Sequence, residues 1–189
     1  MILHIHSDAS FLSEPGAKRR AVRYNSLSTA SADSKKANPK QTPLNEPVHV
    51  KCTNMRNVLA GATEAEIGSL FFNCQRGAAT HIALIDMGHD QPPTPAVKDT
   101  ATGDGFANNN IRQRRSRSIN MRYYWVRDRV RQGQVLVYWM AGEQIIAGYF
   151  TKHHPTSHHQ SQRSIYLVLT ADDSNYGYYM SPIDLRGCD

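Results

Sequence analysis

Three acidic residues stand at positions from which their side chains can meet. Asp8 follows the short apolar run ILHIHS, Asp99 follows the run AVK, and Glu66 lies in a stretch with helical periodicity. Strand-end carboxylates project from one edge of a sheet, and a helix packed on that sheet can supply a third. Clustered like charges stay ionised only when something neutralises them, so such a group predicts a hard divalent cation with oxygen ligands. Beside a basic surface, the implied chemistry is two-metal hydrolysis of a phosphodiester. Taken singly, each aspartate is also compatible with a turn or a helix cap.

Glu66 is the least expected of the three. At 100° per residue, with Glu66 set at 0°, Leu59 lies at about 20° and Leu70 at about 40°, whereas Glu64 lies at about 160°. Glu66 therefore occupies the middle of an apolar helix face. A glutamate is seldom buried without a partner, so Glu66 is either a site residue or the partner of an arginine elsewhere in the chain.

Positive charge is concentrated in one segment. The chain contains 22 Lys+Arg and 16 Asp+Glu, a net charge of +6. Residues 112–131 hold eight arginines against one aspartate, a charge of +7, so the remainder of the chain sums to −1. An arginine stripe is typical of proteins that bind the phosphate backbone of nucleic acids, the alternative being a solvated helix face. We predict that nucleic acid is contacted by Arg112, Arg114, Arg115, Arg117 and Arg122.

Two further groups have ordinary structural explanations. The four histidines of residues 153–159 could bind a transition metal. No nearby cysteine or carboxylate completes a tetrahedral site, however, which favours a polar segment that leaves the domain. The aromatic run 123–125 could stack on bases, but Tyr123 lies on the apolar side of its helix, which favours core packing.

The composition predicts one domain with a packed core. The chain has 189 residues, of which 40% are hydrophobic and 20% charged. No apolar run is long enough to cross a bilayer, and the N-terminus lacks the basic and apolar regions of a secretory signal. The cysteines Cys52, Cys74 and Cys188 form no CxxC pair, which argues against a disulfide framework or a cysteine zinc site. We therefore expect a reducing, intracellular location, cytoplasmic or nuclear, with neither secretion nor membrane association.

Apolar patterns and turn signals define the elements that must position these side chains. Expected strands cover residues 2–7, 21–27, 48–52, 96–98 and 134–139. Expected helices cover residues 54–76, 103–110, 119–131 and 145–152, with Asn54 as the N-cap of the first. Residues 28–47 are predicted as a long polar loop, residues 1–154 as one domain and residues 155–189 as a C-terminal tail. This order of elements predicts an α/β layer structure with a mixed sheet.

Several of these segments occur together in one family. The segments SDASFLSEP around Asp8, RNVLAGATEAEIGSLF around Glu66, and RSRSINMRYYWVRDRVRQGQ followed by AGYFTK resemble the ribonuclease H segment of copia-type LTR retrotransposon polyproteins. The resemblance covers roughly residues 2–154, with the motifs in the family's order. It implies an α/β, RNase H-like fold with a five-stranded mixed sheet flanked by helices. The chain begins at the first expected strand, which suits a fragment or decayed copy of such an element.

The resemblance also implies an activity, the cleavage of the RNA strand of an RNA·DNA hybrid with two Mg²⁺ ions, for which Mn²⁺ can substitute. Asp8, Glu66 and Asp99 match three metal-binding carboxylates of the family, Asp99 standing at the TDN-type strand end with drifted neighbours. The fourth carboxylate is missing, because the family's Ala-Asp reads Ala147-Gly148 here. Its loss should weaken the ion that activates water, so we expect reduced activity. The alternative is a catalytically inactive relic that keeps the fold and binds hybrids or other nucleic acid duplexes.

Overall fold

The computed structural model describes residues 1–10, 18–28, 47–55, 61–99 and 117–166. The chain divides into two compact units, Met1–His153 and His154–Asp189. The described part of the second unit contains a helix, α4 (Thr156–Tyr166), in a segment for which the sequence analysis predicted none. None of the helices in the described ranges is long and apolar enough to cross a membrane.

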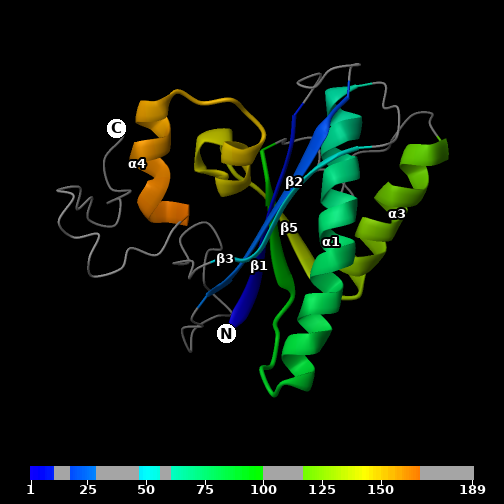
Figure 1. Cartoon of the computed structure of the whole chain (residues 1–189). Helices are drawn as coiled ribbons and strands as arrows, with labels where there is room; N and C mark the ends of the chain where they lie inside the picture. The colour runs from blue at the N-terminus through cyan, green and yellow to red at the C-terminus, as the bar shows by residue number, and fades with distance from the viewer. Residues whose placement is uncertain (11–17, 29–46, 56–60, 100–116, 167–189) are drawn as a thin grey trace. The chain divides into compact units, whose positions relative to one another are not determined.

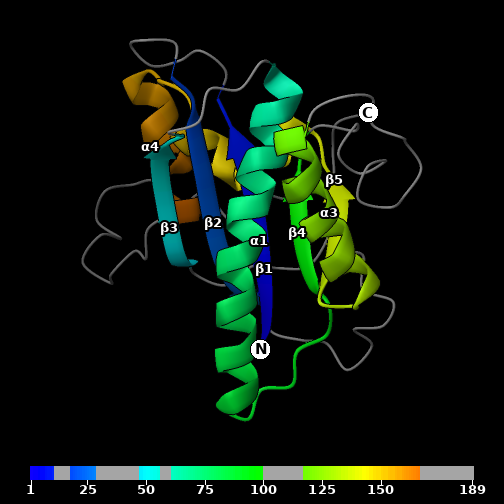
Figure 2. The same ribbon diagram turned by 90° about the vertical axis from the view of Figure 1, so that its right-hand side faces the viewer.

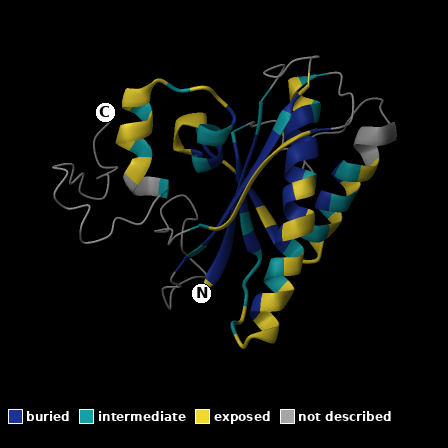
Figure 3. Cartoon of the chain, in the orientation of Figure 1, coloured by how far each residue is buried: buried dark blue, intermediate teal, exposed yellow. Residues whose placement is uncertain are grey.

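The first unit is built on a mixed five-stranded sheet, as the sequence analysis predicted (Figure 2). In spatial order its strands are β3 (Pro47–Asn54), β2 (Arg20–Ser28), β1 (Ile2–Ala9), β4 (Thr94–Lys98) and β5 (Val135–Trp139). The pairs β1–β2 and β2–β3 are antiparallel, whereas β4 runs parallel to both β1 and β5. The central strand β1 is buried along almost its whole length (Figure 3). The carboxyl ends of β1, β4 and β5 consequently lie at the same edge of the sheet.

Two helices, α1 (Ala62–Asp86) and α3 (Arg117–Arg131), lie side by side over one face of this sheet (Figures 1 and 2). Apolar side chains of both layers form the core beneath them, among them Ile5, Leu70, Ala96, Val126 and Val137. Burial of such side chains is the main stabilising term for the layer, about 25 cal/mol for each Å² of apolar surface removed from water. The core thereby fixes α1 against β1, which contains Asp8, and against β4, which Asp99 directly follows.

The opposite face of the sheet is met by a short 3-10 helix, η3 (Ile146–Phe150), and a second one, η2 (Gly142–Gln144), contacts η3. Figure 1 shows this yellow segment on the other side of the sheet from α1 and α3. The ring of Phe150 stacks on Tyr24 of β2, with centroids 6.4 Å apart. Ile5 of β1 packs in the core beneath α1. Successive side chains of a strand point to opposite faces, so His6 and Asp8, which lie one and three positions after Ile5, face η3.

The first helix differs from its expected bounds, covering 62–86 rather than 54–76. Asn54 is the last residue of β3 and pairs with β2. Its pairing in the sheet therefore prevails over its local preference for a helix N-cap. The helix also continues past Gly77, where an added Cβ would collide with the side chain of Ile5. The missing side chain lets α1 approach β1 closely.

The remaining expected elements are matched in part. The helix expected over 119–131 is α3, which begins two residues earlier. The helix expected over 145–152 is replaced by η2 and η3, and the strand expected over 96–98 begins at Thr94. The short helix expected over 103–110 and nearly all of the predicted polar loop lie outside the described residues.

Candidate metal centre

The parallel strands β1 and β4 bring two acidic residues to one edge of the sheet. Their register pairs His6 with Val97. Two residues further along, the same register sets Asp8 level with Asp99, which directly follows β4. Both aspartates therefore leave the sheet at its carboxyl edge, on the face opposite α1.

Glu66 reaches the same point from the first turns of α1. Its Oε1 accepts a hydrogen bond from the N–H of Ala9 at 3.2 Å. About one helical turn later, Ser69 Oγ donates to the carbonyl oxygen of Asp8 at 2.9 Å, which ties the helix to β1 in one register. One oxygen from each of Asp8, Glu66 and Asp99 then lies within 4.8 Å of the others. The structure thus brings the three predicted side chains together, while their roles in metal binding and catalysis stay predictions.

Burial gives this cluster unusual electrostatics. Asp8 and Glu66 expose only 6% and 7% of their surfaces, whereas Asp99 is more open to solvent. Burial, followed by repulsion from Asp8 and then from Asp99, raises the pKa of Glu66 to about 8. Burial also raises the pKa of Asp8, and a hydrogen bond from Thr151 opposes that rise.

The cluster fits a divalent cation. Glu66 Oε2 is buried and has no hydrogen-bond partner among the described residues. A buried carboxylate oxygen is costly to leave unsatisfied, and two further carboxylates lie beside it. Hard cations such as Mg²⁺ or Mn²⁺, which prefer oxygen ligands, would satisfy all three groups.

Gly148 and Thr151 close the site on the face opposite α1. A Cβ added to Gly148 would lie 3.5 Å from Asp8 Oδ2, so this residue, at which the resemblance implies a fourth carboxylate, adjoins the cluster. Thr151 is 2% exposed, and its Oγ1 lies 2.6 Å from Asp8 Oδ2 and 2.8 Å from the Gly148 carbonyl. The hydroxyl donates to Asp8 when that carboxyl is ionised. The sequence analysis missed this contact, although Thr151 lies in the AGYFTK segment that it singled out.

The predicted nucleic-acid contacts are only partly described. Arg112, Arg114 and Arg115 lie outside the described residues, as does the side chain of Arg117. Arg122 is half-buried, and its guanidinium lies 5.3 Å from the ring centroid of Phe72 on the neighbouring α1. The guanidinium therefore lies against α1, and the role of Arg122 as a nucleic-acid contact stays a prediction.

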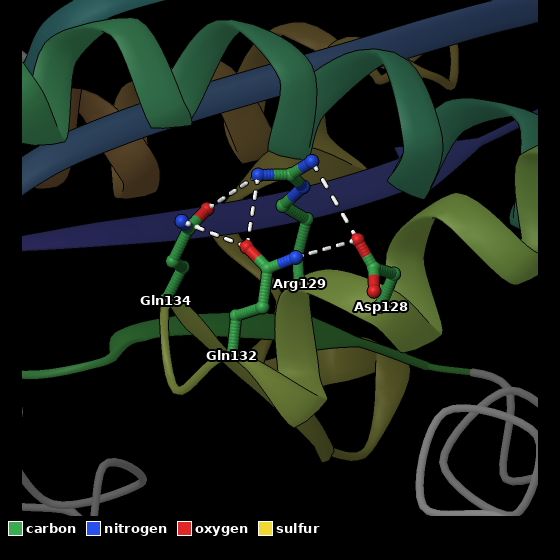
Figure 4. A network of polar contacts seen from close by, with 4 residues as sticks. All are labelled: Asp128, Arg129, Gln132 and Gln134. Atoms are coloured by element: carbon green, nitrogen blue, oxygen red, sulfur yellow. Dashed lines mark hydrogen bonds and ion pairs between the residues drawn. The ribbon is translucent and has the colours of Figure 1, made fainter.

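Further along α3, Arg129 is engaged by its own protein (Figure 4). Its guanidinium donates to Oε1 of Gln132 at 3.2 Å and to Oε1 of Gln134 at 3.1 Å. It also lies 3.6 Å from Asp128 and 5.1 Å from the ring centroid of Trp125. These contacts close the turn between α3 and β5 and account for Arg129 without a nucleic acid ligand.

The aromatic run of α3 and the C-terminal histidines make contacts of other kinds. Tyr123 is buried against Ile67, which agrees with core packing, whereas Tyr124 is exposed. The rings of His154 and His158 stack 4.1 Å apart in the second unit. Within the described residues, the acidic cluster is the one group of three or more His, Cys, Asp or Glu side chains placed to hold a metal ion.

Comparison with known proteins identifies the fold. No protein-family model matches the chain, and no curated protein matches it in sequence. Its structure is similar to the N-terminal RNase H domain of rv2228c from Mycobacterium tuberculosis, with a TM-score of 0.51 and 12% identity over 79% of this chain and 90% of that chain. It is also similar to RNase H1 from Halobacterium salinarum NRC-1 (TM-score 0.46, 13% identity, 80% and 94% covered). A third match is LC11-RNase H1 in complex with an RNA/DNA hybrid (TM-score 0.49, 7% identity, 76% and 88% covered). The first likeness confirms the predicted RNase H-like fold, and at such identities it shows the fold alone.

Proposed function

We propose that this chain is a ribonuclease H-type nuclease that hydrolyses the RNA strand of RNA·DNA hybrids with the help of Mg²⁺ or Mn²⁺. The observation that carries the proposal is the meeting of Asp8, Glu66 and Asp99 within 4.8 Å at the carboxyl edge of the sheet. An RNase H-like fold alone supports many functions, so the argument rests on this site within that fold.

The three carboxylates would hold the cation. A bound divalent cation supplies an acidified water molecule and stabilises negative charge on the reacting phosphate. Thr151 and Ser69 fix Asp8 through its side chain and its carbonyl oxygen, and Ala9 fixes Glu66 through its N–H group. Because burial and the neighbouring aspartates raise the pKa of Glu66 to about 8, binding of a cation near neutral pH would displace a proton from this carboxyl.

The substrate part of the proposal rests on charge and on sequence resemblance. The phosphate backbone would be contacted by Arg112, Arg114, Arg115, Arg117 and Arg122, which makes binding weaker as salt concentration rises. Discrimination of a hybrid from a DNA duplex would rest on the 2′-hydroxyl groups of the RNA strand. An origin in a copia-type retrotransposon belongs to the same proposal and is supported by the segments around Asp8 and Glu66.

Gly148 favours a second candidate function. Because this position adjoins Asp8 and carries no side chain, the cluster has three carboxylates where the polyprotein pattern has four. The chain would then be a module that binds duplexes without cleaving them. Both functions predict salt-sensitive binding, and only the nuclease predicts cleavage that depends on a divalent cation.

A cleavage assay separates these functions. End-labelled RNA·DNA hybrid, DNA duplex and RNA duplex are incubated with the whole chain in Mg²⁺, in Mn²⁺ and in EDTA. The nuclease should cut only the RNA of the hybrid, only with a cation, and Glu66→Gln should abolish the cut. Glu64→Gln, two residues away on the same helix, is the matched control and should remain active. Hybrid binding without cleavage, in the wild type and in Gly148→Asp, would reject the nuclease and leave the binding module.

A further inference from the structure

Arg23 of β2 is a buried arginine whose guanidinium is held in place on the face of the sheet that α1 covers. It exposes 8% of its surface, and its Nε donates to Oδ1 of Asn73 on α1 at 3.3 Å. Asn73 Nδ2 donates in turn to the Val22 carbonyl oxygen and to Ser7 Oγ, both at 2.8 Å, which determines the orientation of the amide. The guanidinium is therefore positioned before any ligand binds.

Most hydrogen-bond donors of this guanidinium are not used by the protein. An arginine has five N–H donors. One is bonded to Asn73, and Nη1 lies 3.4 Å from Nε2 of His49 on β3. Within the described part of the chain the other donors have no partner, and no nitrogen of Arg23 is both enclosed and unbonded. The unused donors of Arg23 consequently reach the surface.

β3 places two further basic side chains beside this guanidinium. Lys51 lies directly opposite Arg23 in the antiparallel register of β2 and β3. His49 lies two positions from Lys51, so all three side chains are on the same face of the sheet. β3 is exposed along almost its whole length, at the side of the sheet that neither α1 nor α3 covers (Figure 2). Lys51 and His49 are therefore open to a ligand.

α1 adds a fourth basic side chain, the exposed Arg76, one turn after Asn73. At 100° per residue, Arg76 lies about 20° from Ala65 on the helix surface. Ala65 packs against Ala21 of β2, so Arg76 also lies on the β2 side of α1. Burial, and after it the charge of Arg76, lowers the pKa of Arg23, as expected for two guanidinium groups near each other.

Arg23, His49, Lys51 and Arg76 form a basic cluster without a counter-charge. Among the described residues no carboxylate lies within ion-pair distance of any of the four. Water can solvate the exposed members, but a buried guanidinium without an anion is costly, which distinguishes this cluster from an ordinary solvated surface. The planar donors of arginine match the oxygens of a phosphate group, and two arginines and a lysine supply three positive charges.

We propose that the basic cluster is a phosphate-binding site and that it takes a backbone phosphate of the bound nucleic acid. The inference rests on the proposed function only in taking nucleic acid as the source of the phosphate. Arg23 is paired with Ser7, the residue before Asp8. Arg76 lies ten residues after Glu66 on α1, about 15 Å along the helix axis. One turn of a duplex is about 34 Å long, so a single duplex can span the metal centre and the basic cluster.

The test is the binding of a fluorescently labelled RNA·DNA hybrid to the whole chain in EDTA, followed by anisotropy at several salt concentrations. Arg76→Gln and Lys51→Gln should each weaken binding about tenfold at low salt and reduce the slope of log affinity against log salt by about one, because each removes one phosphate contact. Arg131→Gln is the matched control. Arg131 is exposed at the end of α3 just before β5, at the edge of the sheet opposite the metal centre, so affinity and slope should stay as in the wild type.

A second arm titrates inorganic phosphate into the same proteins at constant ionic strength, followed by calorimetry. The wild type should bind it far more weakly than the hybrid, because a single phosphate lacks the other contacts of a duplex. Phosphate binding that depends on Arg76 and Lys51, with hybrid binding unchanged in both variants, would overturn nucleic acid as the source and leave a site for free phosphate.

Wild-type affinity for both ligands in Arg76→Gln and Lys51→Gln would overturn the site itself. Both side chains are exposed, so the variants should fold, and circular dichroism checks this. The nuclease proposal would survive that result, since cleavage in Mg²⁺ and its loss in Glu66→Gln are measured separately. Binding in EDTA decides on the basic cluster even where no hybrid is cut.

Discussion

Replacing Glu66 by glutamine should make the metal-free protein more stable at neutral pH. Glu66 is 7% exposed, and burial beside Asp8 and Asp99 raises its pKa to about 8 from an ordinary 4.5. Glutamine keeps the oxygen that accepts the hydrogen bond from Ala9, and it never ionises. The substitution therefore removes the titrating charge and leaves the contacts of the side chain nearly intact.

The sign and size of the effect follow from proton linkage. Between pH 4.5 and about 8 the folded chain holds a proton on Glu66 that the unfolded chain has lost. Stability falls with rising pH wherever the folded state binds more protons, at most by about 1.4 kcal/mol per pH unit for one group. From about pH 5 to about pH 7 the wild type should therefore lose about 2–3 kcal/mol through this residue alone. Glu66→Gln should not lose it.

The assay is urea denaturation of both proteins in EDTA across this pH range. Asp8 titrates in both, so the difference between their unfolding free energies reports Glu66. That difference should grow with pH in favour of Glu66→Gln, and Glu64→Gln should show no such growth. A difference that stays flat from about pH 5 to about pH 7 would refute the reasoning, because Glu66 would then be ionised in the folded state as in the unfolded state.

Three further predictions concern the opposite wall of the site and the helix–sheet contact. Thr151→Val loses the 2.6 Å hydrogen bond to Asp8 and should lower the free energy of unfolding by about 1–2 kcal/mol and weaken Mn²⁺ binding. Thr151→Ser keeps a hydroxyl group and should retain the stability and the Mn²⁺ affinity of the wild type. Equal behaviour of the two variants would contradict this role of Thr151. Gly148→Asp places a like charge beside Asp8, so it should lower the melting temperature in EDTA. In Mg²⁺ the added carboxylate should increase hybrid cleavage. A higher melting temperature in EDTA would contradict the geometry. Gly77→Ala drives a methyl group into Ile5 and should cost about 1–3 kcal/mol by urea denaturation, and Ile5→Val in the same chain should recover part of it. Lack of any recovery would place the strain elsewhere.

The acidic cluster could be predicted from the sequence because it depends on which face of a helix a residue occupies and on where the strands end. The exact first and last residues of each element matter less. Glu66 and Leu70 share a helix face wherever the helix begins, so the error in the start of α1 did not matter. Asp8 and Asp99 close apolar strands, and parallel pairing of those strands sets the two side chains level. Because the carboxyl ends of parallel strands lie at the same edge of a sheet, the two aspartates could be expected to lie close together.

Other parts of the site depend on contacts that no local pattern shows. Thr151 reaches Asp8 across 143 residues, and only the packing of η3 against β1 brings them together. Asn54 is a suitable helix cap by itself, yet its pairing with β2 makes it part of a strand.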